Sequence, residues 1–306
     1  MQAKEEDIMT LEKYPYVIII IPAYNEEASI VDVIDKIKKV YISQNKTYWV
    51  EIIVVDDGSS DRTAKVAREA EVSKIISHIK NRGLGAATRI GLQRAYEMGA
   101  DVVVKIDADL QHDPDDIDKL VQPILADKAD CVFGSRLCGG LKYAMPFYRA
   151  IGNRFFSYLV SKLTGLKITD AQTGLMAFSK RYLKDFEMIS DYNETQQLIM
   201  DASSKHMRII EVPVVFYKRK TGKSFISWSY PIKVVPTIIR FFYYANPLKV
   251  FLPLGIFLIA AGIALGIKIM LSGEGFFGDA TISILVIGGI QVILFGMLAD
   301  MIGTRR

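Results

Sequence analysis

The sequence predicts a charged α/β domain followed by a hairpin of two membrane-spanning helices, and three observations predict it. Strand and helix signals alternate through most of the first 246 of the 306 residues. Charge is unevenly distributed, because 65 of the 72 Lys, Arg, Asp and Glu residues lie within residues 1–246. Two long uncharged apolar runs follow. The mean hydropathy of +0.21 therefore averages two unlike parts and describes neither.

The composition also excludes several classes of protein. Half of the residues are hydrophobic, which excludes an intrinsically disordered chain. The two cysteines, Cys131 and Cys138, are too few for a scaffold held by disulfides. A net charge of +4 that is dispersed along the chain gives no support for a nucleic-acid partner.

The elements of the first part follow from its apolar patterns. Short β-branched runs predict strands, and apolar residues at helical spacing predict helices. The strands are expected at residues 17–21, 52–55, 75–76, 102–106, 132–133, 175–178 and 209–216, and the helices at 26–40, 61–70, 85–98, 114–125, 147–163 and 194–205. This order predicts a parallel or mixed sheet covered by helices, with ligands beyond the C-terminal strand ends. The sequence leaves open whether helix 147–163 packs on the sheet or rests on a membrane.

The two apolar runs, residues 250–267 and 280–299, carry no charge. Each is close to the ~20 residues with which a helix crosses a bilayer, so spans are expected at about 250–270 and 280–300. A buried core helix would explain one such run, but two in tandem favour a multi-pass protein of the cell membrane. Lys and Arg flank the pair at both ends, which predicts a cytoplasmic domain and C-terminus. Residues 1–13 are acidic and polar, unlike a signal peptide.

Residues 230–247 precede the first span and are predicted to form an amphipathic helix in the membrane interface. Their four consecutive aromatic residues, 241–244, follow Arg240, which suits the headgroup region. A core helix of the first domain is the alternative. The expected organisation is an N-terminal extension at 1–14, a folded domain at 15–229, the interfacial helix at 230–247 and the two spans within 248–306.

Polar motifs follow the first two predicted strands. Tyr24 can stack on a base, and Glu26 can accept hydrogen bonds from a base or ribose. After the second strand, the carboxylates of Asp56 and Asp57 can hold ribose hydroxyls. Both motifs have a purely structural alternative, in which the same residues form turns and cap helices.

The fourth strand runs into Asp107 and Asp109. Two carboxylates at the end of a buried strand are costly unless a cation neutralises them. Their oxygens suit Mg²⁺ or Mn²⁺, which complete their shell with phosphate oxygens and water. No cluster of Cys and His is present for zinc, and the three His residues are scattered.

Basic and glycine-rich motifs complete the set. Arg136 follows a strand, and Arg219, Lys220 and Lys223 surround a Thr-Gly pair. These cations can hold phosphates at a membrane surface, or form a solvated loop attracted to anionic lipid. The pair Gly83 and Gly85 can cradle an anion or simply form a turn. A P-loop motif is absent.

Taken in order, six motifs resemble family 2 glycosyltransferases with the GT-A fold, over residues 15–230. Dolichyl-phosphate mannose synthases and polyprenyl-phosphate sugar transferases are the most similar members. The motifs are Pro22-Ala-Tyr-Asn-Glu26, Val55-Asp-Asp57-Gly-Ser-Ser-Asp61, Asp107-Ala-Asp109-Leu-Gln-His, Gly134-Ser-Arg136, Asp170-Ala-Gln-Thr-Gly174 and Arg219-x-x-Gly-Lys-Ser224.

The resemblance implies roles for these residues and Mg²⁺ or Mn²⁺ as the cofactor. The implied nucleotide-sugar ligands are Pro22, Tyr24, Glu26, Val55, Asp57, Asp107, Ala108, Arg219 and Lys223. The implied metal ligands are Asp107, Asp109 and Gln111. The implied catalytic residues are Asp109, Asp170 and Arg136.

The chain departs from the mannose synthases at two places near the sugar. Residues 170–174 stand where the mannose synthases have a D-P-x-S-G motif. The mannose synthases also lack the segment that residues 193–197 form in this chain. The sugar and the choice between UDP and GDP therefore stay open. The Q-x-x-R-W motif of processive polysaccharide synthases is absent, which favours a single transfer.

The predicted function is transfer of one sugar from a UDP- or GDP-linked donor to dolichyl or polyprenyl phosphate. It would take place at the cytoplasmic leaflet and supply a precursor for glycan synthesis or N-glycosylation. A phosphate acceptor is largely ionised at neutral pH, since its second pKa is ~6, so no general base is required. Two alternatives stay open: an enzyme with a hydroxyl acceptor that uses Asp170 as its base, and a non-catalytic nucleotide-sugar-binding scaffold. A homo-oligomer is compatible with the sequence.

Overall fold

The computed structural model describes residues 14–42, 48–139, 147–219, 247–272 and 278–303. The chain divides into two compact units, Met1–Tyr230 and Pro231–Arg306, and each is described by itself. Four predicted features lie outside the described residues: Lys220, Lys223, the N-terminal extension apart from Tyr14, and the interfacial helix apart from Pro247.

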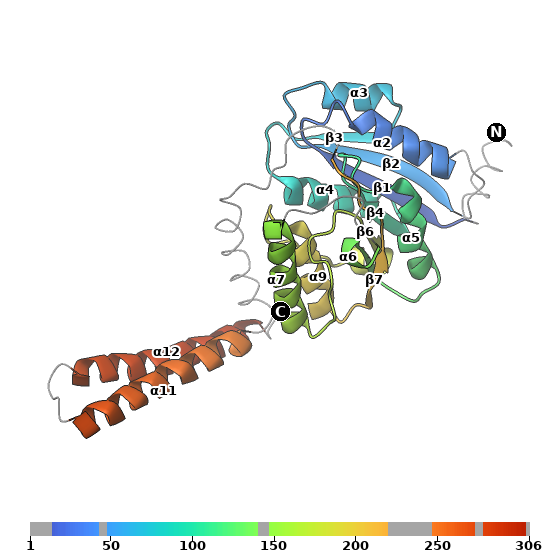
Figure 1. Cartoon of the computed structure of the whole chain (residues 1–306). Coiled ribbons are helices and arrows are strands. Elements are labelled where there is room, and N and C mark those ends of the chain that lie inside the picture. The colour runs from blue at the N-terminus through green and yellow to red at the C-terminus, as the bar shows by residue number, and fades with distance from the viewer. Residues whose placement is uncertain (1–13, 43–47, 140–146, 220–246, 273–277, 304–306) are drawn as a thin grey trace. The chain divides into compact units, whose positions relative to one another are not determined.

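The first unit is built on a seven-stranded mixed sheet in the order β3-β2-β1-β4-β6-β5-β7, shown in Figure 1. The strands are β1 (Tyr16–Ala23), β2 (Trp49–Asp56), β3 (Lys74–Ser77), β4 (Val102–Lys105), β5 (Cys131–Ser135), β6 (Met176–Ser179) and β7 (Ile209–Pro213). Only β6 runs against its neighbours, since it pairs antiparallel with both β4 and β5. The C-terminal ends of β1, β2, β4 and β5 therefore meet at one edge of the sheet, as predicted.

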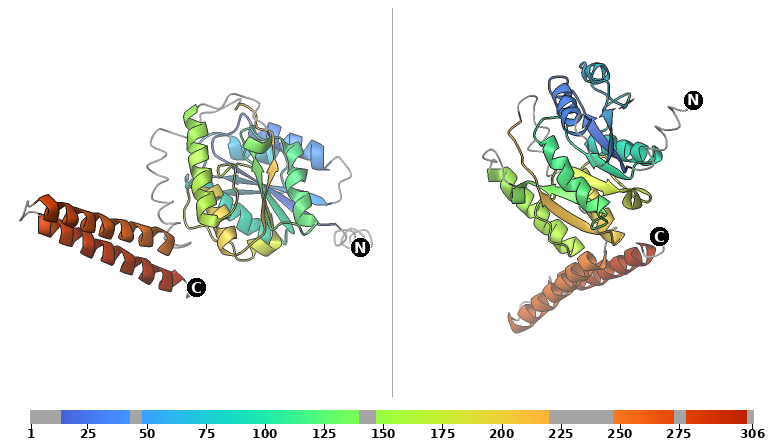
Figure 2. Two further views of the ribbon diagram at one scale, coloured as in Figure 1. Left: turned by 60° about the horizontal axis from the view of Figure 1, so that its bottom comes forward. Right: turned by 90° about the vertical axis from the view of Figure 1, so that its right-hand side faces the viewer.

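Helices cover both faces of this sheet, as Figures 1 and 2 show. Residues of α2 (Ile30–Ile37), α3 (Thr63–Glu69) and α5 (Ile117–Leu125) form one core with the sheet. Residues of α4 (Leu84–Glu97), α7 (Phe147–Thr164), α8 (Lys180–Leu183) and α9 (Glu194–Ser204) form the other. Alternate residues of β1 enter the two cores, because successive side chains of a strand point to opposite faces. The uninterrupted apolar run of β1 is thereby explained.

Several element boundaries differ from the sequence-based expectation. Helix α2 begins at Ile30 instead of residue 26, because residues 27–29 form a turn in which the Ser29 N–H donates to the Glu26 carbonyl at 3.1 Å. The helix expected at 114–125 starts with a 3₁₀ turn, η2 (Pro114–Asp116), before α5. The sequence did not predict the π-helical turn η1 (Lys38–Ile42) or the short helices α6 (Arg136–Gly139) and α8.

The second unit contains two long helices, α11 (Leu248–Ser272) and α12 (Gly278–Gly303), in agreement with the predicted hairpin. Their apolar stretches, Val250–Leu271 and Ala280–Met301, each have 22 residues, enough to cross a membrane. The helices pack closely at Gly255 and Gly289, where a Cβ on either residue would lie 2.7 Å from the carbonyl oxygen of the other. Few of the apolar side chains are buried, unlike those of a soluble core helix.

Candidate active site at the carboxyl edge of the sheet

The loops after β1 and β2 are joined by hydrogen bonds. The Asn25 N–H donates to Ser59 Oγ at 3.0 Å, and the Ser60 N–H donates to Asn25 Oδ1 at 2.8 Å. The Glu26 N–H donates to Thr63 Oγ1 at 2.9 Å. These bonds fix the two motifs into one wall of the site. Tyr24 lies on this wall and is half-buried, whereas Pro22, Val55 and Ala108 are buried.

Asp57 holds the start of α4 in place. Its carboxylate accepts hydrogen bonds from the Arg82 N–H at 3.0 Å and the Gly83 N–H at 2.7 Å, and it lies 2.7 Å from His78 Nδ1. Only 2% of Asp57 is exposed. These contacts support the structural interpretation of Asp57, because its carboxylate orders the loop before α4. Its contact with a nucleotide stays a prediction.

The glycine pair before α4 serves close packing. The Gly85 N–H donates to the Asp191 carbonyl at 3.0 Å, and a Cβ on Gly85 would lie 2.7 Å from the carbonyl carbon of Asp191. The N–H groups of Gly83 and Gly85 thus have protein partners. Of the two predicted interpretations, the turn fits this geometry and the anion cradle does not.

The acidic motif after β4 has a buried lysine beside it. Lys105 is completely buried, and its Nζ lies 2.5 Å from Asp107 Oδ1 and 3.6 Å from Glu194 Oε1. Burial alone would lower the pKa of Lys105, but the charges of Asp107 and Glu194 outweigh burial and raise it. A buried ammonium that is paired with carboxylates in this way stays protonated.

Asp107 and Asp109 are suited to a hard divalent cation. Burial and the charge of Asp107 raise the pKa of Asp109 to about 7, so this carboxyl favours a proton unless a cation takes the place of that proton. Within the described residues, no group of three or more His, Cys, Asp or Glu side chains could hold a metal. Two carboxylates with the Gln111 amide fit Mg²⁺ or Mn²⁺, which take their other ligands from phosphates and water.

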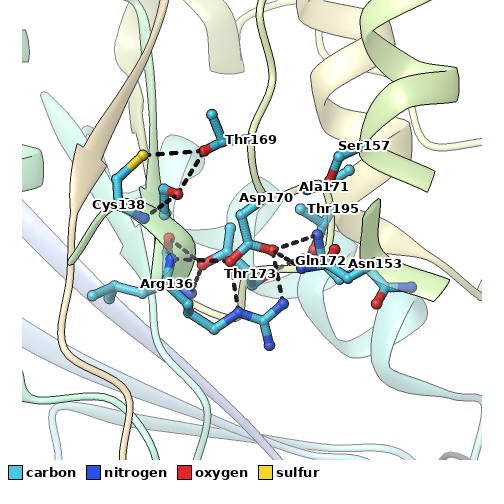
Figure 3. Close-up of polar contacts among 12 residues, drawn as sticks. Arg136, Cys138, Asn153, Ser157, Thr169, Asp170, Ala171, Gln172, Thr173 and Thr195 are labelled. Atoms are coloured by element: carbon cyan, nitrogen blue, oxygen red, sulfur yellow. Dashed lines mark hydrogen bonds and ion pairs between the residues drawn. The ribbon is translucent and has the colours of Figure 1, made fainter. Parts of the chain in front are cut away.

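A buried ion pair between Arg136 and Asp170 forms another part of the site (Figure 3). Arg136 Nε donates to Asp170 Oδ2 at 2.6 Å and Nη2 donates to Oδ1 at 2.7 Å, a bidentate arrangement. Asn153 Nδ2, from α7, also donates to Asp170 Oδ1 at 3.1 Å. Burial would raise the pKa of Asp170, but the Arg136 hydrogen bonds and charge outweigh it and hold the pKa below its ordinary value.

Arg219 connects the loop after β1 with the acidic motif. Its guanidinium donates to Glu26 Oε1, and Nη1 lies 3.8 Å from Asp109 Oδ2. Nearby, the Gln111 side chain donates to the Tyr217 carbonyl at 3.1 Å. The segment after β7 thus joins the predicted nucleotide wall to the predicted metal ligands.

Sequence reasoning did not assign a role to several residues that contact this site. Gly174 packs so closely that an added Cβ would lie 1.8 Å from Asp107 Oδ2. Both ring nitrogens of His112 are buried without a hydrogen-bond partner within the described structure. A lysine in the apolar run of β4 was one available signal, since an unpaired charge there would be costly. The residues concerned are Lys105, His112, Asn153, Gly174 and Glu194.

Comparison with known proteins is consistent with this geometry. The family model of "Glycosyl transferase family 2" matches residues 18–186, and that of the "GtrB C-terminal hairpin" matches residues 246–304. UDP-N-acetylglucosamine–dolichyl-phosphate N-acetylglucosaminyltransferase of Methanococcus voltae is 39% identical over an alignment of 216 residues, and the match covers 64% of this chain and 83% of that protein. Dolichol-phosphate mannosyltransferase of Pyrococcus furiosus is 32% identical over 67% of this chain and 58% of its own length.

The fold also matches solved structures. Glucosyl-3-phosphoglycerate synthase from Mycobacterium tuberculosis, solved with Mn²⁺ and UDP-glucose, superposes with a TM-score of 0.59. The match covers 77% of this chain and 82% of that chain at 20% sequence identity. At this identity the likeness establishes the GT-A fold and says nothing of the substrate.

Proposed function

The chain belongs to glycosyl transferase family 2, and from that premise we propose that it transfers one sugar from a nucleoside diphosphate sugar to dolichyl or another polyprenyl phosphate. The names of both relatives include a dolichyl phosphate acceptor, and the hairpin model matches the C-terminal unit. Their names also give different sugars, so the choice of sugar and of UDP or GDP is a matter for assay.

The observation that carries the proposal is the state of Asp170. Its side chain has no exposed surface and is bound by Arg136 and Asn153. An ionised carboxylate held in this way is poorly suited to take a proton from an acceptor. A hydroxyl acceptor would require such a base, whereas a phosphate monoester is already largely ionised. The arrangement therefore favours a phosphate acceptor over the hydroxyl alternative.

Asp107, Asp109 and Gln111 would hold Mg²⁺ or Mn²⁺, which supplies positive charge to the departing nucleoside diphosphate. The chain adds its own cations: Arg136 and Arg219 would offset repulsion between donor and acceptor phosphates, with Lys223 as a further candidate. The base and ribose would lie along the wall formed by Tyr24 and Glu26, with Pro22, Val55, Asp57 and Ala108 shaping it.

The exposed face of α7 supports an acceptor in the membrane. Ile151, Phe155 and Tyr158 are 51%, 59% and 63% exposed, and Arg154 is exposed beside them. Aromatic and basic side chains on one helix face suit the headgroup region of a bilayer. The opposite face carries Asn153, which binds Asp170. We therefore propose that α7 rests on the membrane and that the lipid phosphate approaches the site from there.

The proposed localisation is the cytoplasmic side of the cell membrane. The Lys and Arg residues that flank the hairpin support cytoplasmic placement of the catalytic domain and the C-terminus. The proposed domain bounds are 15–229 for the catalytic domain, 230–247 for the interfacial helix and 248–306 for the spans. In this location, the product would serve as a precursor for glycan synthesis.

One assay tests the proposed function. Purified full-length chain is incubated with Mn²⁺, polyprenyl phosphate and a panel of UDP- and GDP-sugars, and the lipid product is identified by mass. We expect one glycosyl unit on the lipid phosphate and an equal amount of free nucleoside diphosphate. Nucleotide release only with hydroxyl acceptors would favour the alternative enzyme, and no release with any acceptor would favour a binding scaffold. The Asp109→Ala variant serves as the inactive control.

A further inference from the structure

Lys105 is in an unusual place for a lysine. It is completely buried at the end of β4, and the two carboxylates beside it are Asp107 at 2.5 Å and Glu194 at 3.6 Å. One of these, Asp107, is a ligand of the proposed metal site. A buried ammonium without a carboxylate partner would be strongly destabilising, so the lysine must keep at least one of the two.

A metal ion and the lysine would compete for the same carboxylate. A cation that binds Asp107 reduces the attraction of Asp107 for Lys105, because two positive charges then face one negative charge. Glu194 offers the ammonium a second carboxylate, at 3.6 Å. Glu194 is the first residue of α9 and directly follows Asn193, which has a left-handed backbone conformation.

We propose that Lys105 and Glu194 act as a latch for metal binding, in which the ammonium is shared with Asp107 in the metal-free enzyme and passes to Glu194 when Asp107 takes a divalent cation. This inference rests on the proposed metal site. Lys105 and Glu194 are positioning residues: the lysine holds Asp107 in place before the metal arrives, and the glutamate receives the lysine afterwards.

The close contact at Gly174 limits the other ways in which Asp107 can respond. An added Cβ there would lie 1.8 Å from Asp107 Oδ2 and 2.9 Å from His112 Nε2, so the carboxylate has little free space on that side. Asp107 is therefore confined on the side of Gly174, and the proposal assigns the change of partner to the Lys105 side chain. The latch also links the metal site to α9, since the partner of the lysine changes with metal occupancy.

The test measures Mn²⁺ binding to the full-length chain in detergent, without nucleotide, from the electron paramagnetic resonance signal of free Mn²⁺. Lys105→Met removes the competing cation, so Mn²⁺ affinity should rise. Glu194→Gln removes the second site of the ammonium, so affinity should fall by about tenfold, the lower end of the loss expected when residues behind metal ligands are removed. Circular dichroism checks that both variants are folded.

The double variant separates the latch from a simple effect of charge. In the Lys105→Met background there is no ammonium to receive, so adding Glu194→Gln should change Mn²⁺ affinity by less than about twofold. If Glu194 acted only through its negative charge, the substitution would lower affinity in both backgrounds, and that result would overturn the latch. Lys180→Met and Glu97→Gln, which change the same charges at exposed positions, are the matched controls and should leave affinity unchanged.

Failure of the latch and failure of the metal site give different results. If wild-type enzyme binds Mn²⁺ but Lys105→Met and Glu194→Gln do not shift affinity in opposite directions, the latch is wrong and the metal site stands. If Asp109→Ala binds Mn²⁺ as tightly as the wild-type chain, the metal site itself is misplaced, and the latch falls with it. Should Lys105→Met fail to fold, Lys105→Gln and the isosteric Glu194→Gln still decide the sign of the two effects.

Discussion

Arg136 binds Asp170 through two side-chain hydrogen bonds, at 2.6 and 2.7 Å, and the carboxylate that it binds has no exposed surface. The Arg136 backbone N–H adds a third bond to the same group at 3.0 Å. The pair joins the end of β5 to the loop before β6. It places Arg136, whose side chain is 11% exposed, at the sheet edge where donor and acceptor phosphates are proposed to meet.

The first prediction concerns the stability that this pair provides. Asp170→Asn leaves the Arg136 charge buried without its counter-charge, so the free energy of unfolding should fall by about 3–5 kcal/mol. Thermal unfolding of the full-length chain in detergent measures the change. Asp101→Asn is the matched control, because its ion pair with Lys180 is exposed and should contribute about 0–1 kcal/mol. Equal losses for the two variants would contradict the structural role of Asp170.

The second prediction concerns pH. The Arg136 pair holds the pKa of Asp170 below its ordinary value despite burial. The contribution of this ion pair to the free energy of unfolding is therefore complete above the carboxyl pKa of the unfolded chain. It is lost as the pH falls through the lowered pKa of Asp170 in the folded chain. Between about pH 6 and 9, Asp170 is ionised in both the folded and the unfolded chain. It should therefore add no inflection to the pH–rate profile in this range. An inflection that disappears in Asp170→Asn would show that Asp170 acts as a base.

Much of the fold was predictable because its elements are long and periodic. The buried run of β1 and the helical spacing in α2 carry the signal without any tertiary information. Helices α6 and α8 were not predicted, since four residues are too few to show a helical period. The antiparallel direction of β6 was also beyond the sequence pattern, because a short apolar run does not reveal its orientation.

The candidate site was predictable where function requires a motif next to a strand end, as at Asp107 and Asp109. The contacts of Glu194 with Lys105 and of Asn153 with Asp170 were not, because they join residues from separate elements. A structural role for Asp57 was among the predicted alternatives, but its partners, the N–H groups of Arg82 and Gly83, were not predicted for a related reason. A carboxylate that binds a nucleotide and one that caps a loop have the same local sequence.

The third prediction concerns Gly174. A Cβ at this position would lie 1.8 Å from Asp107 Oδ2, so Gly174→Ala must displace the carboxylate. We expect turnover to fall by about 100-fold, as when a catalytic group is misplaced by 1 Å. Gly152→Ala is the control, because nothing lies within 4 Å of an added Cβ in helix α7. Sugar transfer at saturating donor is the measurement, and an active Gly174→Ala enzyme would show that Asp107 has more freedom than this packing allows.

The fourth prediction concerns Arg219, which contacts Glu26 and lies 3.8 Å from Asp109 Oδ2. Because it joins two parts of the proposed donor site, Arg219→Ala should raise the KM of the nucleotide sugar by about tenfold or more, as expected for loss of a charge-assisted hydrogen bond. Arg62→Ala, which breaks an exposed ion pair with Glu27, should leave this KM unchanged. An effect of Arg219→Ala confined to the KM of the lipid phosphate would assign Arg219 to the acceptor instead.

The fifth prediction concerns the exposed face of α7. Phe155 and Tyr158 are 59% and 63% exposed, and the proposed function places them in the membrane interface. The double variant Phe155→Ser and Tyr158→Ser removes apolar burial of about 1.5–3 kcal/mol for each ring, so the KM for polyprenyl phosphate in vesicles should rise by tenfold or more. The KM for the nucleotide sugar should stay unchanged, because neither ring is on the donor wall.

The pair Ile189→Ser and Tyr192→Ser, also exposed but outside α7, is the control. If both double variants use polyprenyl phosphate as well as the wild-type chain does, α7 does not rest on the membrane and the acceptor must approach from elsewhere.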